Sequence, residues 1–151
     1  MEQPECNMEK GKTFRRYAGL LLILPLILIW QTAAAADPIG KNDKEVRAIA
    51  DPILNNVLTG FNEGNYAKYS RDFTPTLLEA ISAKRFQQVR EDILKKIGKY
   101  QSRKYLGFYQ YNRTTVVLWK GRFSKTDNDV LIKLVVSKRK DKNLVVGLWF
   151  Q

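Results

Sequence analysis

Tyrosine and tryptophan side chains are the residues of this chain best suited to binding. Each combines a large apolar ring with one hydrogen-bonding group, which suits a small apolar or amphipathic ligand or a protein surface. Tyr105, Tyr109 and Tyr111 have the same parity in one strand-like run, so we expect their hydroxyl groups to project from one face. The residues predicted to line a ligand pocket or a partner face are Tyr66, Tyr69, Tyr105, Tyr109, Tyr111, Trp119 and Trp149. Core packing and aromatic pairs across strands would explain the same residues without a ligand.

Basic side chains crowd a predicted turn near the end of the chain. Lys138, Arg139, Lys140 and Lys142 lie within five consecutive positions, interrupted only by Asp141. Near an anionic phospholipid surface, each such cation contributes about 1 kcal/mol of attraction. These four residues are therefore predicted to contact an anionic envelope surface. A solvated turn that protects the end of a strand is the alternative explanation.

The chain lacks the side chains that most hydrolytic and metal chemistry requires. It contains no histidine, and its single cysteine, Cys6, stands near the N-terminus. Zinc sites, Cys–His nucleophiles and Ser–His–Asp triads are thereby excluded, and we expect neither a metal nor another cofactor. A carboxylate base such as Asp72 is what remains for a small isomerase-like or hydrolase-like enzyme. No acid lies among the aromatic strand positions, so a non-catalytic role is favoured.

The first 36 residues are typical of a secretory signal peptide. Arg15 and Arg16 precede an apolar run of 14 residues from Tyr17 to Trp30, and small residues follow. Because signal peptidase requires small side chains before the scissile bond, cleavage is predicted between Ala36 and Asp37. The competing interpretation is an uncleaved anchor, since the 20 residues from Tyr17 to Ala36 are just enough to span a bilayer. Both place the rest of the chain outside the cytoplasm, either periplasmic or secreted.

The charge of the chain is compatible with that location. Its net charge is +11, from 26 Lys and Arg against 15 Asp and Glu. Such a charge favours anionic partners, among them phospholipid headgroups, cell-wall polymers and nucleic acid. Export disfavours nucleic acid, which a secreted domain seldom meets. A soluble, self-repelling surface would explain the charge without any partner.

Residues 37–42 are predicted as a linker and residues 43–151 as one domain, in which helices come first. Apolar residues at helical spacing predict a helix from Asn42 or Asp43 to Gly60. A short helix is predicted over Tyr66–Phe73. Thr74 and Pro75 then form a favoured helix start, and the following segment, one helix or two with a break near Ser82, runs to Gly98.

Beyond Gly98 the apolar residues alternate, which predicts strands. The four runs are Tyr100–Tyr111, Thr114–Phe123, Asp129–Lys138 and Leu144–Phe150, with hairpin loops at 124–128 and 138–143. The predicted fold class is α+β, with N-terminal helices packed on a four-stranded antiparallel meander.

The face of this sheet turned away from the helices is expected to be unusually apolar. The residues predicted there are Val116, Leu118, Leu131, Val135 and Trp149. A face that meets only water should carry more polar residues. Either the sheet curls around a cavity or this face meets a partner, a second copy of the chain included.

Three stretches carry a resemblance to a known family: residues 57–66 (VLTGFNEGNY), 86–98 (FQQVREDILKKIG) and 144–150 (LVVGLWF). With helices followed by a curved four-stranded sheet, the chain resembles the nuclear-transport-factor-two-like superfamily, also called ketosteroid-isomerase-like or cystatin-like. Within it, the chain is similar to a secreted bacterial family with no assigned activity. The resemblance implies that the sheet is curved and cone-shaped, and that the open end of the cone can hold a small apolar or amphipathic ligand. Enzymes of this superfamily use an Asp base with a Tyr or protonated acid as oxyanion donor, and no pair of residues here matches that spacing.

Three functions follow as hypotheses. The favoured one is an exported, non-catalytic binding or accessory domain for a small molecule or a protein. The second is a small isomerase-like enzyme with a carboxylate base. The third is an envelope-assembly component held by an uncleaved N-terminal anchor. The sequence identifies neither the ligand nor the biological process.

Overall fold

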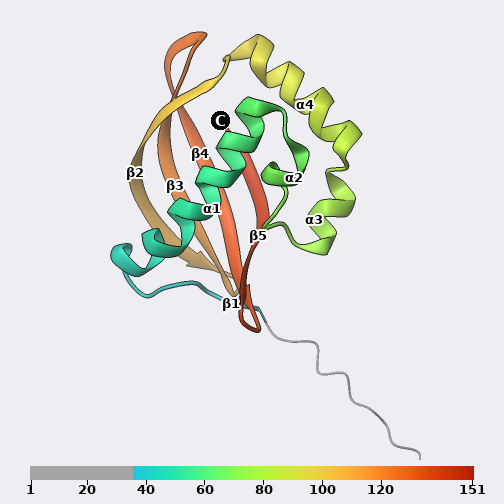
Figure 1. Ribbon diagram of the computed structural model, residues 1–151. Helices are drawn as coiled ribbons and strands as arrows, with labels where there is room; N and C mark the ends of the chain where they lie inside the picture. The colour runs from blue at the N-terminus through green and yellow to red at the C-terminus, as the bar shows by residue number, and fades with distance from the viewer. Residues whose placement is uncertain (1–35) are drawn as a thin grey trace, which may run out of the picture. The chain divides into compact units, whose positions relative to one another are not determined.

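After a two-residue strand, helices come first and the long strands second along residues 36–151, the part of the chain that the computed structural model describes. Figure 1 shows the elements in order, which are β1 (Ala36–Asp37), α1 (Asp43–Glu63), α2 (Tyr66–Tyr69), α3 (Pro75–Ala80), α4 (Ala83–Lys96), β2 (Tyr100–Tyr111), β3 (Thr114–Phe123), β4 (Thr126–Arg139) and β5 (Lys142–Phe150). The predicted signal peptide and its anchor alternative fall on residues 1–35 and lie outside this part. The predicted scissile bond, Ala36–Asp37, falls inside β1.

Local side-chain chemistry sets the bounds of α1. The Asn42 side chain accepts a hydrogen bond from the backbone N–H of Glu45 (3.0 Å), and the Glu45 carboxylate reaches back to the N–H of Lys41 (2.9 Å). The helix ends at Glu63 because Gly64 adopts a left-handed conformation (φ 72°). The prediction that it ends at Gly60 was wrong. Gly60 stays helical, and its missing side chain lets the backbone of Tyr69 approach closely.

Side-chain caps also fix the shorter helices. Thr74 caps α3 with Pro75 at its first position, and Ser82 caps α4. The segment predicted as one helix or two is therefore two helices, divided at Ser82. The helix predicted over Tyr66–Phe73 is shorter, because residues 72–74 leave it to pair with β5. There Val145 donates to the Asp72 carbonyl (2.7 Å), and Thr74 donates to the Val145 carbonyl (2.9 Å).

All the main strands pair antiparallel, with β5, β4, β3 and β2 side by side and the two-residue β1 pairing with β4. The predicted runs for β2 and β3 are confirmed. The runs for β4 and β5 were too short, because both of their hairpins close with two-residue turns, at 124–125 and 140–141. In the second turn Lys140 takes the left-handed conformation (φ 54°) that tight hairpins require.

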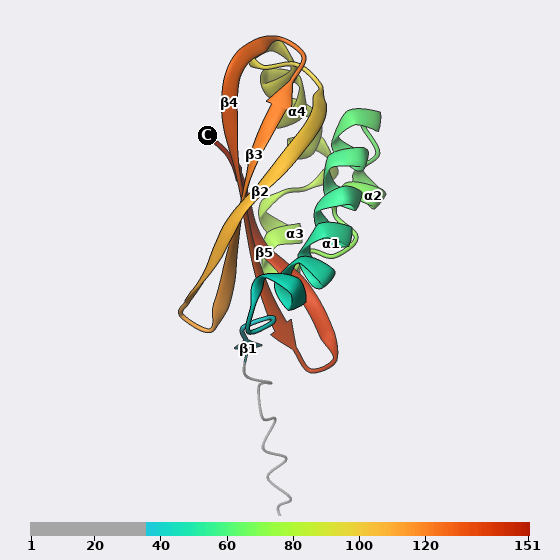
Figure 2. The ribbon, with the colours of Figure 1, turned by 90° about the vertical axis from the view of Figure 1, so that its left-hand side faces the viewer.

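The sheet carries helices on one face only. In Figure 2 the strongly twisted sheet stands on one side and all four helices stand on the other. In Figure 1, α1 runs diagonally across the inner face of the curled, half-barrel sheet. The α+β prediction, helices on a curved antiparallel meander, is therefore confirmed.

The segment predicted as a linker, residues 37–42, is bound to the sheet. Ile39 is buried, and its backbone N–H donates to the Thr115 hydroxyl (2.9 Å) while that hydroxyl donates to the Ile39 carbonyl (3.1 Å). Because Thr115 lies on β3, this exchange fixes the start of the described chain to the middle of the sheet.

Two of the four register shifts in the sheet decide on which face the predicted aromatic residues lie. In β2 the register shifts between Tyr105 and Gly107, and Leu106 is the extra residue. In β5 it shifts at Val146, opposite the step from Val135 to Val136 in β4. A bulge reverses the alternation beyond it. Strict alternation along either strand was therefore a wrong expectation.

None of the helices in residues 36–151 has the length and apolarity needed to cross a bilayer.

Candidate functional site

The structure does not bring the seven predicted aromatic residues together. Tyr69 and Trp119 are 6% and 1% exposed and belong to the core. Tyr66 is half-buried and donates its hydroxyl to the Ile81 carbonyl (2.7 Å). Tyr105 lies on the inner face beside Trp119, with ring centroids 6.1 Å apart. Each of these four residues has a packing or hydrogen-bonding role inside the fold.

The other three predicted residues lie on the opposite face of the sheet. Tyr109, Tyr111 and Trp149 are 49%, 62% and 44% exposed. The expectation that Tyr105 shares a face with Tyr109 and Tyr111 was wrong, because the Leu106 bulge separates them.

The interior of the half-barrel is filled by side chains. Those between α1 and the sheet are at most 7% exposed. They are Val46, Ala50, Ile53, Leu54, Val57, Leu58 and Phe61 from α1, with Val117, Trp119, Phe123, Val130, Ile132, Leu134, Val136 and Val145 from the sheet. Such packing leaves these side chains no water-filled cone to line.

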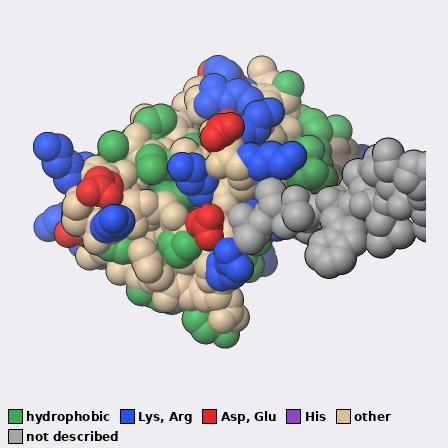
Figure 3. All heavy atoms as spheres, turned by 90° about the horizontal axis from the view of Figure 1, so that it is seen from below, with side chains coloured by type: hydrophobic (Ala, Val, Ile, Leu, Met, Phe, Trp, Pro, Cys, Tyr) green, Lys and Arg blue, Asp and Glu red, His purple; other side chains and the backbone are tan. Residues whose placement is uncertain are grey.

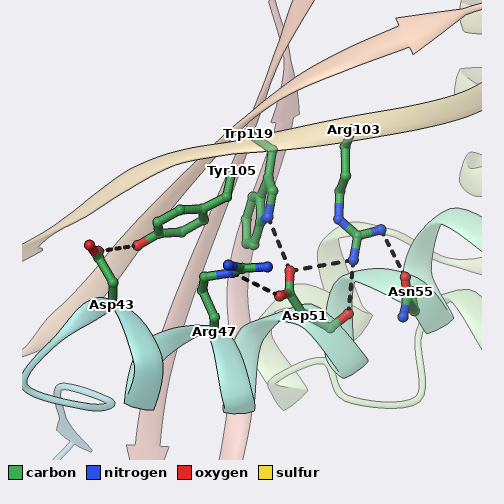
Figure 4. A network of polar contacts seen from close by, with 7 residues as sticks. All are labelled: Asp43, Arg47, Asp51, Asn55, Arg103, Tyr105 and Trp119. Atoms are coloured by element: carbon green, nitrogen blue, oxygen red, sulfur yellow. Dashed lines mark hydrogen bonds and ion pairs between the residues drawn. The ribbon is translucent and has the colours of Figure 1, made fainter.

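A polar network closes the edge where α1 meets β2 (Figure 4). Its centre is the Asp51 carboxylate on α1, which accepts the indole N–H of Trp119 (3.2 Å). The same carboxylate accepts Nε of Arg47 (3.2 Å) and Nη2 of Arg103 (3.4 Å). One acid thus ties its own helix to two strands.

Arg103 connects β2 to α1 in this network. Its guanidinium also donates to the Asn55 side chain (2.8 Å) and to the Asp51 backbone carbonyl (3.3 Å). Its side chain is only 14% exposed. With its donors shared among protein acceptors, Arg103 holds β2 against α1.

Tyr105 completes the network as a hydrogen-bond donor. Its hydroxyl donates to the Asp43 carboxylate (2.7 Å), and the Arg47 guanidinium lies 5.1 Å from its ring centroid. Partial burial first, and then the Asp43 hydrogen bond and charge, raise the pKa of Tyr105 to about 12. Tyr105 is therefore a neutral phenol at physiological pH.

The network is suited to holding elements together. Its carboxylates accept from guanidinium, indole and phenol groups of the same fold, and a shallow groove of about 400 Å³ runs beside it. A general base needs a free lone pair within reach of a substrate proton. Asp51 has each of its oxygens engaged.

Asp72, the suggested base, lies at a surface cleft between α1, the α2–α3 segment and the β4–β5 hairpin. It pairs with Arg71 (3.1 Å), and its side chain is 22% exposed. The cleft measures about 800 Å³ and has an apolar floor that includes Ile49 and Phe73. Between Ala36 and Gln151, no carboxylate is among the buried residues of the core.

The outer face of the sheet carries an apolar surface, here called the outer patch. Cross-strand register assigns to it Tyr109, Tyr111, Val116, Leu118, Leu131, Val135 and Trp149. Of these, Tyr109, Tyr111 and Trp149 are exposed, Leu118, Leu131 and Val135 are half-buried, and Val116 is buried. Cross-strand register makes them neighbours: Tyr109 lies opposite Val116, and Val116 lies opposite Val135. Figure 2 shows this side of the sheet bare of helices. The apolar outer face expected from the sequence is present.

The indole of Trp149 lies over Gly147 of the same strand. A side chain at Gly147 would overlap the six-membered ring of Trp149, so the glycine leaves the space in which the indole lies. Nζ of Lys133, the residue opposite Trp149 on β4, is 4.5 Å from the ring centroid, a cation–π contact. The indole is thus pre-positioned, although almost half of it is exposed.

Charges surround the outer patch. Cross-strand register and alternation place Lys104, Lys120, Arg122, Asp129 and Lys133 on its side of the sheet. Asp129 pairs with Lys120 (3.0 Å) and Arg122 (3.3 Å), and hydrogen bonding from Lys120 lowers its pKa. Four cations against one carboxylate make this rim basic.

The four cations predicted to meet an anionic surface are all exposed, at the end of the sheet where β1 pairs with β4. Lys138 and Arg139 end β4, Lys140 is in the turn, and Lys142 begins β5. The structure therefore groups them on one hairpin, as the sequence indicated.

Within residues 36–151 no cluster of three or more His, Cys, Asp or Glu side chains is arranged to hold a metal ion. No protein-family model, curated protein or solved structure matches this chain. The candidate sites consequently rest on this chain's own geometry.

Sequence reasoning missed the Asp51–Arg103 network. The two residues are 52 positions apart, and neither belongs to a motif. The only local signal was Asp51 itself, an acid at the edge of an apolar helical stripe. Its partners become apparent only when β2 is placed beside α1.

Proposed function

We propose that this chain is an exported, non-catalytic accessory domain that binds an acidic protein partner through the outer patch. The observation that carries the proposal is the contrast between a filled interior and an exposed, pre-positioned Trp149 on the bare face of the sheet. The helices-then-curled-sheet order supports a place in the nuclear-transport-factor-two-like superfamily, which we also propose. That fold hosts many functions, so the patch carries the functional argument.

A protein surface fits this patch better than a small molecule does. Tyr and Trp dominate the energetics of protein interfaces, where they sit among apolar neighbours and inside a polar rim. Here Tyr109, Tyr111 and Trp149 occupy such positions, and charged residues flank them. A small ligand needs a concave site that surrounds it, whereas these residues lie on the helix-free face of a sheet.

The charges favour an acidic partner over a second copy of the chain. In a symmetric dimer the same surface meets itself, so Lys104, Lys120 and Lys133 would approach their own copies. Like charges at an interface oppose association, and an acidic partner surface would neutralise them. The net charge of +11 acts in the same direction.

A photo-reactive phenylalanine analogue at Tyr109 tests this proposal in the native host. We expect a cross-link to one acidic protein, which is then identified, purified and titrated against the full chain. Trp149→Ala should weaken the complex about thirtyfold, because truncating an aromatic hot-spot residue removes about 2 kcal/mol. Added salt should weaken it as well.

The same analogue at Leu78, exposed on α3, is the matched control and should not capture this protein. If position 109 cross-links only to another copy of the chain, the outer patch is a homodimer interface and the proposed acidic partner is wrong. If positions 78 and 109 capture the protein equally, binding is not specific to the outer face and the proposal is contradicted.

A small apolar or amphipathic ligand in the Asp72 cleft is the second candidate. It is favoured by an opening of about 800 Å³ that combines an apolar floor with Arg71 and Lys142 at the rim. A fatty acid such as laurate fits that chemistry. Laurate should raise the melting temperature of the full chain, and Ile49→Trp should abolish the shift by filling the floor. No shift in the unaltered chain would remove this candidate.

A further inference from the structure

One end of the sheet collects the start of the described chain and two hairpin tips. In Figure 2 the β2–β3 and β4–β5 hairpins point downward on either side of β1. Ala36 and Asp37 of β1 lie opposite Arg139 and Lys138 of β4. Figure 3 looks at this end from below and shows several Lys and Arg side chains on it. We call it the basal end.

The β4–β5 hairpin concentrates cations at the basal end. Arg139 lies directly opposite Lys142, and like charges in such positions repel one another. Lys140, at the tip, adopts the left-handed conformation (φ 54°), which a lysine adopts less readily than Gly or Asn does. In the part of the chain that the structure describes, none of these three side chains, nor Lys138, is ion-paired. An anionic surface would relieve the repulsion.

The other hairpin adds a cation that holds the chain at this end. Arg113 takes the left-handed conformation (φ 62°) at the tip of the β2–β3 turn. Its Nε donates to the Ala36 carbonyl (2.6 Å), and its Nη2 pairs with the Asp37 carboxylate (3.0 Å). The first described residues are therefore fixed between the two basic hairpins.

The sequence upstream of this point is apolar. Residues 17–35, which precede β1 directly, comprise 19 residues without a charged side chain, and Arg15 and Arg16 come before them. A bilayer span takes about 17–25 residues, and the Arg15–Arg16 pair favours a cytoplasmic N-terminal flank. In a chain that retains residues 17–35 across a bilayer, Ala36 emerges at the surface of the membrane. Anionic headgroups attract cations over about a Debye length, roughly 8 Å at physiological ionic strength. The basal cations are the ones that adjoin Ala36 in the fold.

We infer that the basal end docks on a bilayer of anionic phospholipid, with Lys138, Arg139, Lys140 and Lys142 as the contacting side chains. This inference is independent of the outer patch and its protein partner. The strands run away from the basal end in Figure 1, so docking there leaves both faces of the sheet clear of the bilayer. The membrane would thus orient the domain and present the outer patch sideways.

Fluorescence quenching in the full chain tests the docking. Cys6→Ser and Asp141→Cys place a single fluorophore at the basal hairpin, and the chain is reconstituted into nanodiscs that contain nitroxide-labelled lipid. With phosphatidylglycerol present, we expect strong quenching that high salt reverses. With phosphatidylcholine alone, quenching should be weak. A fluorophore at Glu91→Cys on α4 reports on the opposite end and should stay unquenched in both bilayers.

Charge variants distinguish an effect of the basal hairpin on docking from an effect of the net charge of the protein. Replacing Lys138, Arg139, Lys140 and Lys142 with Gln should lower the ratio of docked to undocked protein about fivefold for each cation removed. Replacing Lys84, Arg85, Lys95 and Lys96 on α4 changes the net charge equally and should leave docking intact. Lys140→Gly removes one cation and also relieves the left-handed conformation, so its loss of docking cannot come from unfolding.

Equal quenching in both bilayers would show that the upstream segment alone holds the hairpin near the membrane, and would overturn the inference. Equal effects of the two quadruple variants would also overturn it. Salt-sensitive binding to duplex DNA by the unaltered chain, lost in the hairpin variant and combined with no response to phosphatidylglycerol, would assign the hairpin to nucleic acid instead.

Discussion

The two faces of the sheet carry similar apolar residues and differ in how deeply these residues are buried. On the inner face, Val117, Trp119, Ile132 and Leu134 are at most 1% exposed beneath α1. On the outer face, Tyr109 and Trp149 are almost half exposed, with no helix to cover them. A single helical layer buries one face only. Burial therefore makes the inner face a stabilising core and leaves the outer face as the candidate for recognition.

The largest expected difference between the faces is in stability. Trp119→Ala removes a fully buried indole that also donates to Asp51, and should lower the free energy of unfolding by about 3–5 kcal/mol. Trp149→Ala removes a surface indole and should lower it by about 1 kcal/mol. Urea unfolding followed by circular dichroism measures both. Equal losses would contradict the division into core and recognition faces.

The next prediction concerns the edge where α1 meets β2. Arg103→Ala deletes charge-assisted hydrogen bonds to Asp51 from a side chain that is 14% exposed, and should destabilise the fold by about 1.5–3 kcal/mol. Arg71→Ala is the matched control, because Arg71 is 58% exposed in its pair with Asp72. It should change stability by about 1 kcal/mol at most. An Arg103 variant as stable as the Arg71 variant would show that the network does not hold the edge closed.

A smaller effect on stability is expected on the outer face. Gly147→Ala should push Trp149 off the sheet, because the added methyl group would overlap its ring. The unfolding free energy should change by about 1 kcal/mol or less, whereas Trp emission should shift to longer wavelength and partner affinity should fall. An unchanged emission spectrum together with full affinity would show that the position of the indole is not what the partner recognises.

The smallest expected effect is a dependence of stability on alkaline pH, which involves tyrosines on the inner side of the sheet only. Burial raises the pKa of Tyr69 to about 12, and burial with the Asp43 hydrogen bond raises that of Tyr105 to about 12, against an ordinary value of 10.0. Because the folded state favours the neutral phenols, their contribution to stability is complete below pH 10 and declines as the pH rises towards 12. Absorbance at alkaline pH should show a late-titrating group that Tyr105→Phe removes. A variant with an unchanged titration curve would argue against the Asp43 contact.

Local patterns in the sequence predicted most of the fold. Thr74 marked a helix start that the structure confirms, Asn42 was one of the two caps predicted for α1, and Gly98 (φ 83°) follows the last helix as expected. These signals depend on hydrogen bonds between residues a few positions apart. Strand alternation likewise predicted β2 and β3 with their exact bounds.

Local patterns could not predict on which face of the sheet an individual side chain lies. One extra residue, Leu106, puts Tyr105 on the inner face and Tyr109 on the outer face. Another, Val146, puts Val145 in the core while Trp149 stays outside. A bulge is a mismatch between two strands, so it is invisible in either strand alone. The Asp51–Arg103 contact has the same origin, because it forms only after distant elements pack.

Hydroxyl-radical footprinting gives the most direct test of the claim that function lies on the outer face. It compares the full chain alone with the full chain bound to the purified partner that cross-linking identifies. We predict that Tyr109, Tyr111 and Trp149 are oxidised in the free protein and protected in the complex, while Tyr69 and Trp119 resist oxidation in both. Oxidation of Trp119 in the free protein, followed by its protection on binding while Trp149 stays reactive, would contradict the prediction and place the binding site inside the half-barrel.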